Sequence, residues 1–186
     1  MAGCDLTTGR GKACYDIIGG LKAVYFSVDS MGIVAYDSTD TDVVETLAGT
    51  PEFFQYDLRG SVNTFAEVPT KSIDNGTSFW AQTLTIQLPK LTKEMQKELK
   101  LLVYASPTVI IQTKAGEYLI MGLENQADVT GGNFSTGGAS GDFSGYNLVL
   151  TAEEKKPASF ILNADPPVAG VIEDTTATVS AVQTSP

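Results

Sequence analysis

The sequence predicts a mainly β protein: an antiparallel β-sandwich or partly closed barrel with one flanking α-helix at about residues 91–104. Short runs rich in β-branched and aromatic residues recur between Gly, Pro and Asp turn signals. One of them, residues 77–88, alternates apolar and polar side chains. A single stretch, from Leu91, has apolar residues at helical spacing. Together these patterns favour packed sheets with extended hairpins and arms.

The 186 residues are enough for one domain with its own core. We expect residues 1–162 to form this domain, beginning with a Gly-rich N-terminal arm, and residues 163–186, rich in Pro, Thr and Ala, to form a tail. The first short strands are expected at residues 13–18, 21–29, 33–36 and 43–47. Residues 52–58 and 62–68 predict a hairpin around Gly60, because Gly supplies the positive φ of short turns.

Residues 77–88 form the clearest predicted strand. The turn signal Asp74-Asn75-Gly76 precedes it, and Pro89 ends it because proline has no N–H for the ladder. One side of the strand is apolar and belongs in a core: Leu84, Ile86 and Leu88. The other side is polar: Thr83, Thr85 and Gln87.

The helix has both a start signal and a core face. Thr92 can cap its N-terminus, and Glu94 lies in the first turn, where the helix dipole favours an acid. An apolar stripe follows at spacings of three and four, and we expect it to pack on a sheet: Leu91, Met95, Leu99, Leu102 and Val103. Ser106-Pro107 ends the helix.

More strands are expected after the helix. Residues 108–113 and 118–123 predict a second hairpin around Gly116. Residues 128–143 are dense in Gly, Ser and Thr and predict a long loop. The last strands are expected at residues 146–151 and 159–162.

The charge is strongly acidic, with 22 Asp and Glu against 12 Lys and Arg and a net charge of -10. This balance argues against a protein that grips nucleic acid through its phosphates, which requires clustered cations. From Asp37 through Asp57 there are six acidic residues and no basic one. That run is either a solvated face or a patch aimed at a partner.

No arrangement of residues suggests catalysis, a metal or a cofactor. The chain has no histidine, which removes Ser-His, Cys-His and His-metal sites. Cys4 and Cys14 fit no zinc spacing. Because the start of the sequence has no secretory signal, we expect cytosolic assembly and free thiols rather than a disulfide. Because no catalytic arrangement is present in the sequence, we also expect no enzymatic activity. No apolar run approaches the roughly 20 residues that a membrane helix needs.

The order of elements from residue 77 onward resembles bacteriophage tail tube proteins. The segments that carry the resemblance are residues 145–151 (GYNLVLT) and 153–160 (EEKKPASF), and residues 19–26 (GGLKAVYF) are similar to phage structural proteins. The resemblance implies a small β-sandwich with one helix on its flank and a long hairpin. It also implies that six copies close into a ring with a continuous β-barrel wall, and that rings stack into a tube through which DNA passes.

If the resemblance holds, the chain is a structural subunit of a virion that contacts itself and other virion proteins. The lumen-facing candidates are then Thr83, Thr85 and Gln87, together with the hairpin of residues 52–68, and the wall should be acidic so that DNA slides without binding. The alternative is a head decoration, neck or host-attachment module with a sandwich fold. A bacterial secretion-tube or pilus-like subunit shares the physics of the first hypothesis.

Overall fold

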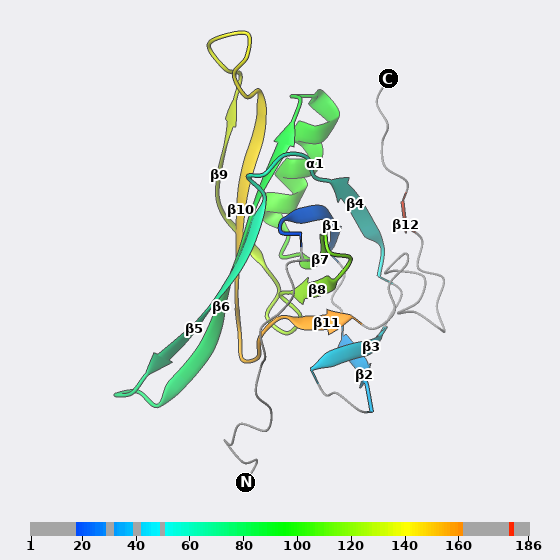
Figure 1. The fold of residues 1–186 in the computed structure, drawn as a ribbon, viewed down its shortest axis with the longest axis vertical. Helices are drawn as coiled ribbons and strands as arrows, with labels where there is room; N and C mark the ends of the chain where they lie inside the picture. The colour runs from blue at the N-terminus through cyan, green and yellow to red at the C-terminus, as the bar shows by residue number, and fades with distance from the viewer. Residues whose placement is uncertain (1–17, 29–31, 39–41, 49–50, 162–178, 181–186) are drawn as a thin grey trace.

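The computed structural model of the chain describes residues 18–28, 32–38, 42–48, 51–161 and 179–180. In this part of the chain there are two β-sheets and one α-helix (Figure 1). The predicted mainly β sandwich with one helix is confirmed, and the described strands do not close into a barrel. The N-terminal arm, the strand expected at residues 13–18, Cys4 and Cys14 lie outside the described residues.

The smaller sheet is antiparallel throughout, in the order β5-β6-β10-β9. Its strands are β5 (Thr64–Ser72), β6 (Thr77–Pro89), β10 (Gly145–Glu154) and β9 (Asp128–Ser135). Strand β10 pairs along its whole length with the C-terminal part of β6, from Gly145 opposite Pro89 to Glu154 opposite Trp80. The turn predicted at Asp74-Asn75-Gly76 joins β5 to β6, with Gly76 at φ +64.

The larger sheet has eight strands in the order β12-β4-β1-β7-β8-β11-β3-β2. In chain order they are β1 (Leu21–Ser27), β2 (Gly32–Tyr36), β3 (Val43–Ala48), β4 (Phe53–Asp57), β7 (Thr108–Thr113), β8 (Tyr118–Met121), β11 (Ser159–Ile161) and β12 (Val179–Ser180). Two pairs, β11 with β3 and β12 with β4, are parallel. The tail expected at residues 163–186 is therefore described only where β12 joins this sheet.

Both faces of the central strands of the larger sheet are buried. One face meets the smaller sheet in the main core, which includes Val24, Ile111, Met121, Leu84, Ile86 and Leu150. The other face encloses a second core, to which strands from both halves of the sheet contribute: Tyr25, Val44, Phe53, Ile110, Ile120 and Ile161. The sheet curves around this second core, which explains why its strands read as continuous apolar runs.

The helix α1 (Lys93–Tyr104) closes one end of the main core (Figure 1). The Thr92 side chain accepts a hydrogen bond of 3.2 Å from the Met95 backbone N–H, as the capping prediction required. Leu99 and Leu102 are buried, and Met95 packs against them. Leu91 is half-buried and precedes the helix.

Val103 does not belong to the core face, and this part of the prediction was wrong. Its side chain is 52% exposed. The buried stripe runs from Met95 through Leu99 to Leu102, and Val103 lies one helical step, about 100°, beyond Leu102. The face of α1 that meets the core is narrow and uses one residue in each helical turn, so Val103 falls outside it.

The predicted hairpin of residues 52–68 is also wrong. Strand β4 pairs with β1 in the larger sheet, whereas β5 pairs with β6 in the smaller one. The connection crosses between the sheets and is fixed by buried Asn63, whose amide donates to the Arg59 carbonyl and accepts from the Gln87 N–H. The Gly60 turn signal is real, since Gly60 has φ +86, but it marks a crossover and not a hairpin.

The expected loop at residues 128–143 contains strand β9. One of its glycines permits a close backbone approach: a Cβ on Gly132 would lie 2.4 Å from the Asn147 carbonyl oxygen of β10. Only the end of the segment is a loop, and Asp142 holds it by accepting hydrogen bonds from the Gly138 and Ala139 N–H groups. These bonds lower the pKa of the Asp142 carboxyl.

Candidate assembly surface

The side of the smaller sheet that faces away from the core is the strongest candidate for a functional surface. Along β6, buried Gln82, Leu84 and Ile86 alternate with half-buried Thr83, Thr85 and Gln87. The strand pairings extend this polar side across the sheet, and we call it the outward face. Its members are Thr64, Ala66, Val68, Thr70, Phe79, Ala81, Thr83, Thr85, Gln87, Asp128, Thr130, Gly131, Asn133, Asn147, Val149, Thr151 and Glu153.

The outward face is largely neutral. Apart from Phe79 and two acids, its residues carry hydroxyls, amides or small apolar groups, and none is Lys or Arg. Its acids, Asp128 and Glu153, lie at one end of the strands, beside Thr151 and Ala81. The expectation of an acidic wall therefore applies to that end alone, because the acidic residues of the chain lie mostly on other elements.

Both edges of the smaller sheet are open within the described part of the chain. Strand β5 pairs only with β6, and β9 pairs only with β10. On β5, Pro69 and Lys71 discourage pairing near the turn, and Thr64 to Val68 contains one charged residue, the inward-facing Glu67. Open strand edges are templates for pairing with another chain.

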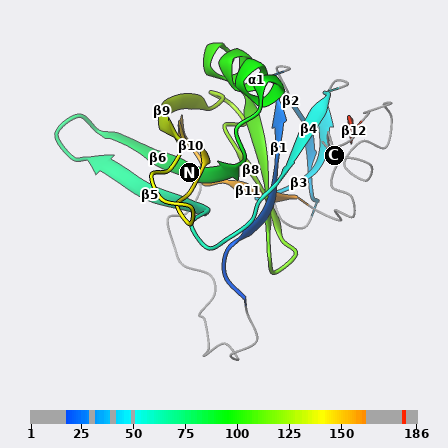
Figure 2. The same cartoon turned by 90° about the horizontal axis from the view of Figure 1, so that it is seen from above.

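The β5–β6 hairpin extends beyond the sheet. Strand β10 ends with Glu154 opposite Trp80, so the part of β6 before Trp80 pairs with β5 alone. Figure 2 shows this hairpin projecting from the body of the molecule. At its tip Ile73 is 87% exposed. A large apolar side chain at the end of a projecting hairpin is suited to contact with a partner surface.

A buried polar network ties the base of this hairpin to the rest of the molecule. The Gln82 side chain, 1% exposed, donates to Glu67 Oε1 at 2.9 Å and accepts from the Gly122 N–H at 3.2 Å. Glu67 Oε1 also accepts from the Ala158 N–H at 2.6 Å. Gln82 lies on the same side of β6 as Leu84 and Ile86, and nothing in the sequence shows that its partners lie on distant segments.

Glu154 is a second buried polar anchor. Its Oε1 accepts hydrogen bonds from the Glu124 and Asn125 N–H groups at 3.0 and 2.9 Å. Burial raises the pKa of the Glu154 carboxyl, although these two bonds act in the opposite direction. The side chain therefore fixes the turn after β8 onto the end of β10.

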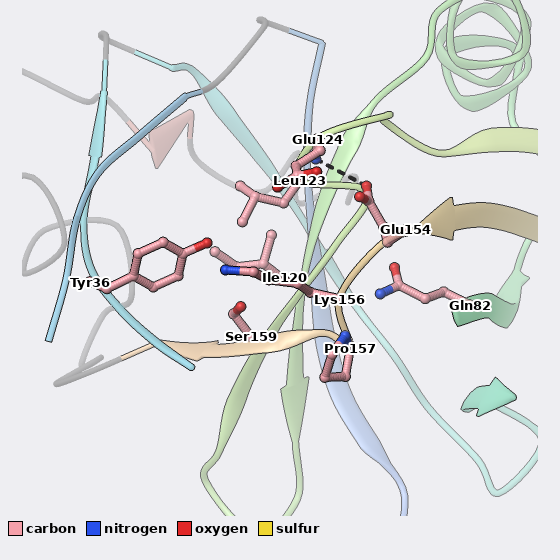
Figure 3. A pocket seen from close by; sticks show the side chains of 9 residues that line it. All are labelled: Tyr36, Gln82, Ile120, Leu123, Glu124, Glu154, Lys156, Pro157 and Ser159. Carbon is pink, nitrogen blue, oxygen red and sulfur yellow. Dashed lines mark hydrogen bonds between the residues drawn. The ribbon is translucent and has the colours of Figure 1, made fainter. Parts of the chain in front are cut away.

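The cavity beside Glu154 is too small for a substrate (Figure 3). It is lined by Tyr36, Gln82, Ile120, Leu123, Glu124, Glu154, Lys156, Pro157 and Ser159. Its volume of about 20 Å³ is enough for one water molecule. Lys156 closes its side, with Nζ 4.8 Å from the centre of the Tyr36 ring.

Two kinds of feature are absent from the described residues. No group of three or more Cys, Asp or Glu side chains in this part of the chain could hold a metal ion. The described helix is not long and apolar enough to cross a membrane.

No protein-family model, curated protein or solved structure matches the chain. Inferences about function must therefore start from the outward face, its open edges and the projecting hairpin.

Proposed function

We propose that this protein is a structural subunit of a phage virion, a tail tube protein whose copies form stacked hexameric rings around a lumen that conducts DNA. The observation that carries the proposal is the outward face: an extended, mostly polar surface without a cation, on a sheet whose two edges are open within the described part of the chain. The protein would work in the virion and would contact itself and other virion proteins.

The chemistry of the outward face suits a conduit. DNA is held through its phosphates by Lys and Arg, and this face has neither. Thr83, Thr85 and Gln87 lie in its centre and present short, neutral, hydrated groups. A wall of this kind lets a polyanion pass without binding it.

The open edges provide a way to close a ring. Strand β5 of one copy can pair with β9 of the next, which makes a heterologous contact, and such contacts give rings when the rotation closes. The resulting barrel would remove both open edges, which otherwise favour uncontrolled aggregation. The hairpin that carries Ile73 would reach over the neighbouring copy.

A lysine on the β5 edge tests this contact. We expect Val68→Lys, at a site that is 59% exposed, to leave the subunit folded but to reduce ring mass, because edge lysines oppose strand addition. Val62→Lys is the matched control, since Val62 is 51% exposed and precedes β5. Light scattering and circular dichroism measure the two properties. Rings that survive Val68→Lys unchanged would contradict closure through β5.

A decoration or attachment module is the second candidate, and the projecting hairpin favours it. A tip bearing Ile73 could dock on a capsid lattice as readily as on a neighbouring subunit. This candidate predicts a monomer or trimer that binds capsids or glycans. The mass of the purified protein separates it from the tube subunit.

A further inference from the structure

The loop at the tip of the β5–β6 hairpin contains a dipeptide that is chemically reactive where it is exposed. The loop consists of residues 73–76 and is closed by Ser72, which pairs with Thr77. It contains Asn75 followed by Gly76, and no other asparagine of the chain precedes a glycine. The backbone nitrogen of the residue after an asparagine can attack the asparagine side chain. Glycine hinders this attack least, because it has no Cβ.

The structure leaves both reacting groups accessible. Ile73, Asp74, Asn75 and Gly76 are all exposed. A Cβ placed on Gly76 would meet nothing within 4 Å, so a ring that joins Gly76 to the Asn75 side chain has room to form. Among the described residues, no backbone hydrogen bond of a turn or loop engages the Gly76 N–H.

The hairpin also gives the loop little rigidity. The part of β6 before Trp80 pairs with β5 alone and projects from the body of the molecule (Figure 2). A two-stranded ribbon has little stability of its own, and exposed loops open at a low cost in free energy. The loop can therefore reach the geometry in which the Gly76 nitrogen approaches Asn75 Cγ.

We propose that Asn75 is a site of spontaneous covalent modification, at which the chain converts asparagine into isoaspartate and aspartate. The Gly76 nitrogen forms a bond to Asn75 Cγ, the bond from Cγ to the side-chain nitrogen breaks, and ammonia leaves with the proton of the Gly76 N–H. Water then opens the resulting cyclic imide at either of its carbonyls. One opening gives aspartate, and the other gives isoaspartate, in which the main chain runs through the former side chain.

Either product changes the tip of the hairpin. A carboxylate replaces the amide of Asn75 directly after Asp74, so two adjacent negative charges lie close to the exposed side chain of Ile73. Isoaspartate also adds a methylene to the main chain between Ser72 and Thr77, in a loop whose length sets the register of the hairpin.

The consequence for assembly rests on the proposed function. If the hairpin reaches over a neighbouring copy, that contact covers the tip and restrains its loop. Unassembled subunits are then the copies that convert, and assembled copies are protected. The modification itself requires only an exposed tip and does not depend on a tube.

Peptide mapping of the purified wild-type protein tests the inference. Trypsin cleaves after Lys71 and Lys90, and the fragment of residues 72–90 contains Asn75 as its one asparagine. During incubation at pH 8 this fragment should gain the mass that accompanies replacement of NH2 by OH, and an isoaspartyl methyltransferase should label it. The rate should lie within about tenfold of the rate in a synthetic peptide of the same residues, because exposed loops open easily.

Two comparisons make the test specific. The variant Asn75→Gln keeps an amide but would have to close a larger ring, so its fragment should stay unmodified, and circular dichroism verifies that it folds. Asn133 and Asn147 lie in the paired strands β9 and β10 and are not followed by glycine, so they should convert far more slowly than Asn75. A wild-type fragment that stays unmodified while the peptide converts would overturn the inference, as would equal conversion at all three asparagines.

The outcomes also separate this inference from the proposed function. Conversion of Asn75 in a protein that stays monomeric would support the modification and reject the tube. Rings formed by a protein whose Asn75 stays intact before assembly, while the peptide converts, would reject the modification and leave the tube standing. Conversion that stops once rings have formed would support both.

Discussion

Single residues decide how the helix is joined to the sheets. Leu99 is 6% exposed and lies in the main core, whereas Leu101, two residues later, is 56% exposed. The same substitution at both sites changes helix propensity equally, but only at Leu99 does it also change a buried side chain. Comparing the two variants therefore measures the effect of burial.

We expect Leu99→Asp to reduce the free energy of unfolding by about 4 kcal/mol, because it places an unpaired carboxylate in an apolar core. Leu101→Asp should change it by less than about 1 kcal/mol. Urea unfolding followed by circular dichroism measures both. A native-like Leu99→Asp protein would show that the helix does not pack through this face.

Glu154 should make stability depend on pH. Burial raises its pKa in the folded state, so the folded protein holds this proton more tightly than the unfolded chain does. The stabilisation from the protonated Glu154 carboxyl is therefore complete below the ordinary carboxyl pKa. It is lost as the pH rises through the raised pKa of the folded state.

The variant Glu154→Gln keeps an oxygen that can accept from the Glu124 and Asn125 N–H groups but has no charge to desolvate. We expect it to be at least as stable as wild type at pH 7 and to lack this fall in stability above the ordinary pKa. Urea unfolding from pH 4 to pH 8 tests this. An unchanged pH slope would show that another group is responsible.

At the scale of elements, sequence patterns predicted the features that depend on neighbouring residues, such as strand alternation and helix capping. Alternation located β6 and its two sides, and Thr92 located the start of α1. The crossover between β4 and β5 could not be predicted, because it depends on which sheet each strand joins. Strand β9 was missed because its Gly131-Gly132 pair has the composition of a loop, although Gly132 is needed for close contact with β10.

The glycine in β9 gives an element-scale prediction. Gly132→Ala should cost about 3 kcal/mol, because the new Cβ would meet the Asn147 carbonyl and the φ of +150 is unfavourable for alanine. Gly141→Ala is the control, since a Cβ there meets nothing within 4 Å. Thermal unfolding compares the two variants. Equal stabilities would mean that β9 does not pair closely with β10.

For the whole molecule, the candidate surface was predicted only in part. Thr83, Thr85 and Gln87 lie together on the outward face as alternation required. Their neighbours from β5, β9 and β10 could not be predicted, because strand pairing between distant segments has no local signal. The neutral character of the face became evident only once these strands were assembled.

If the outward face lines a lumen, cations placed there should retain DNA. We expect Thr83→Lys/Thr85→Lys/Gln87→Lys to leave folding intact, since these side chains point away from the core, and to make assembled tubes hold duplex DNA in a salt-dependent way. Ser61→Lys/Ala115→Lys/Ser140→Lys adds the same charge at exposed sites elsewhere. Tubes of the first variant that release DNA like the control would remove these residues from the lumen.

The measurement that tests the central claim most directly is negative-stain electron microscopy of the purified wild-type protein, combined with its mass from light scattering. The account predicts rings, or hollow tubes of stacked rings, with a central pore. A compact monomer or trimer at high concentration would contradict it.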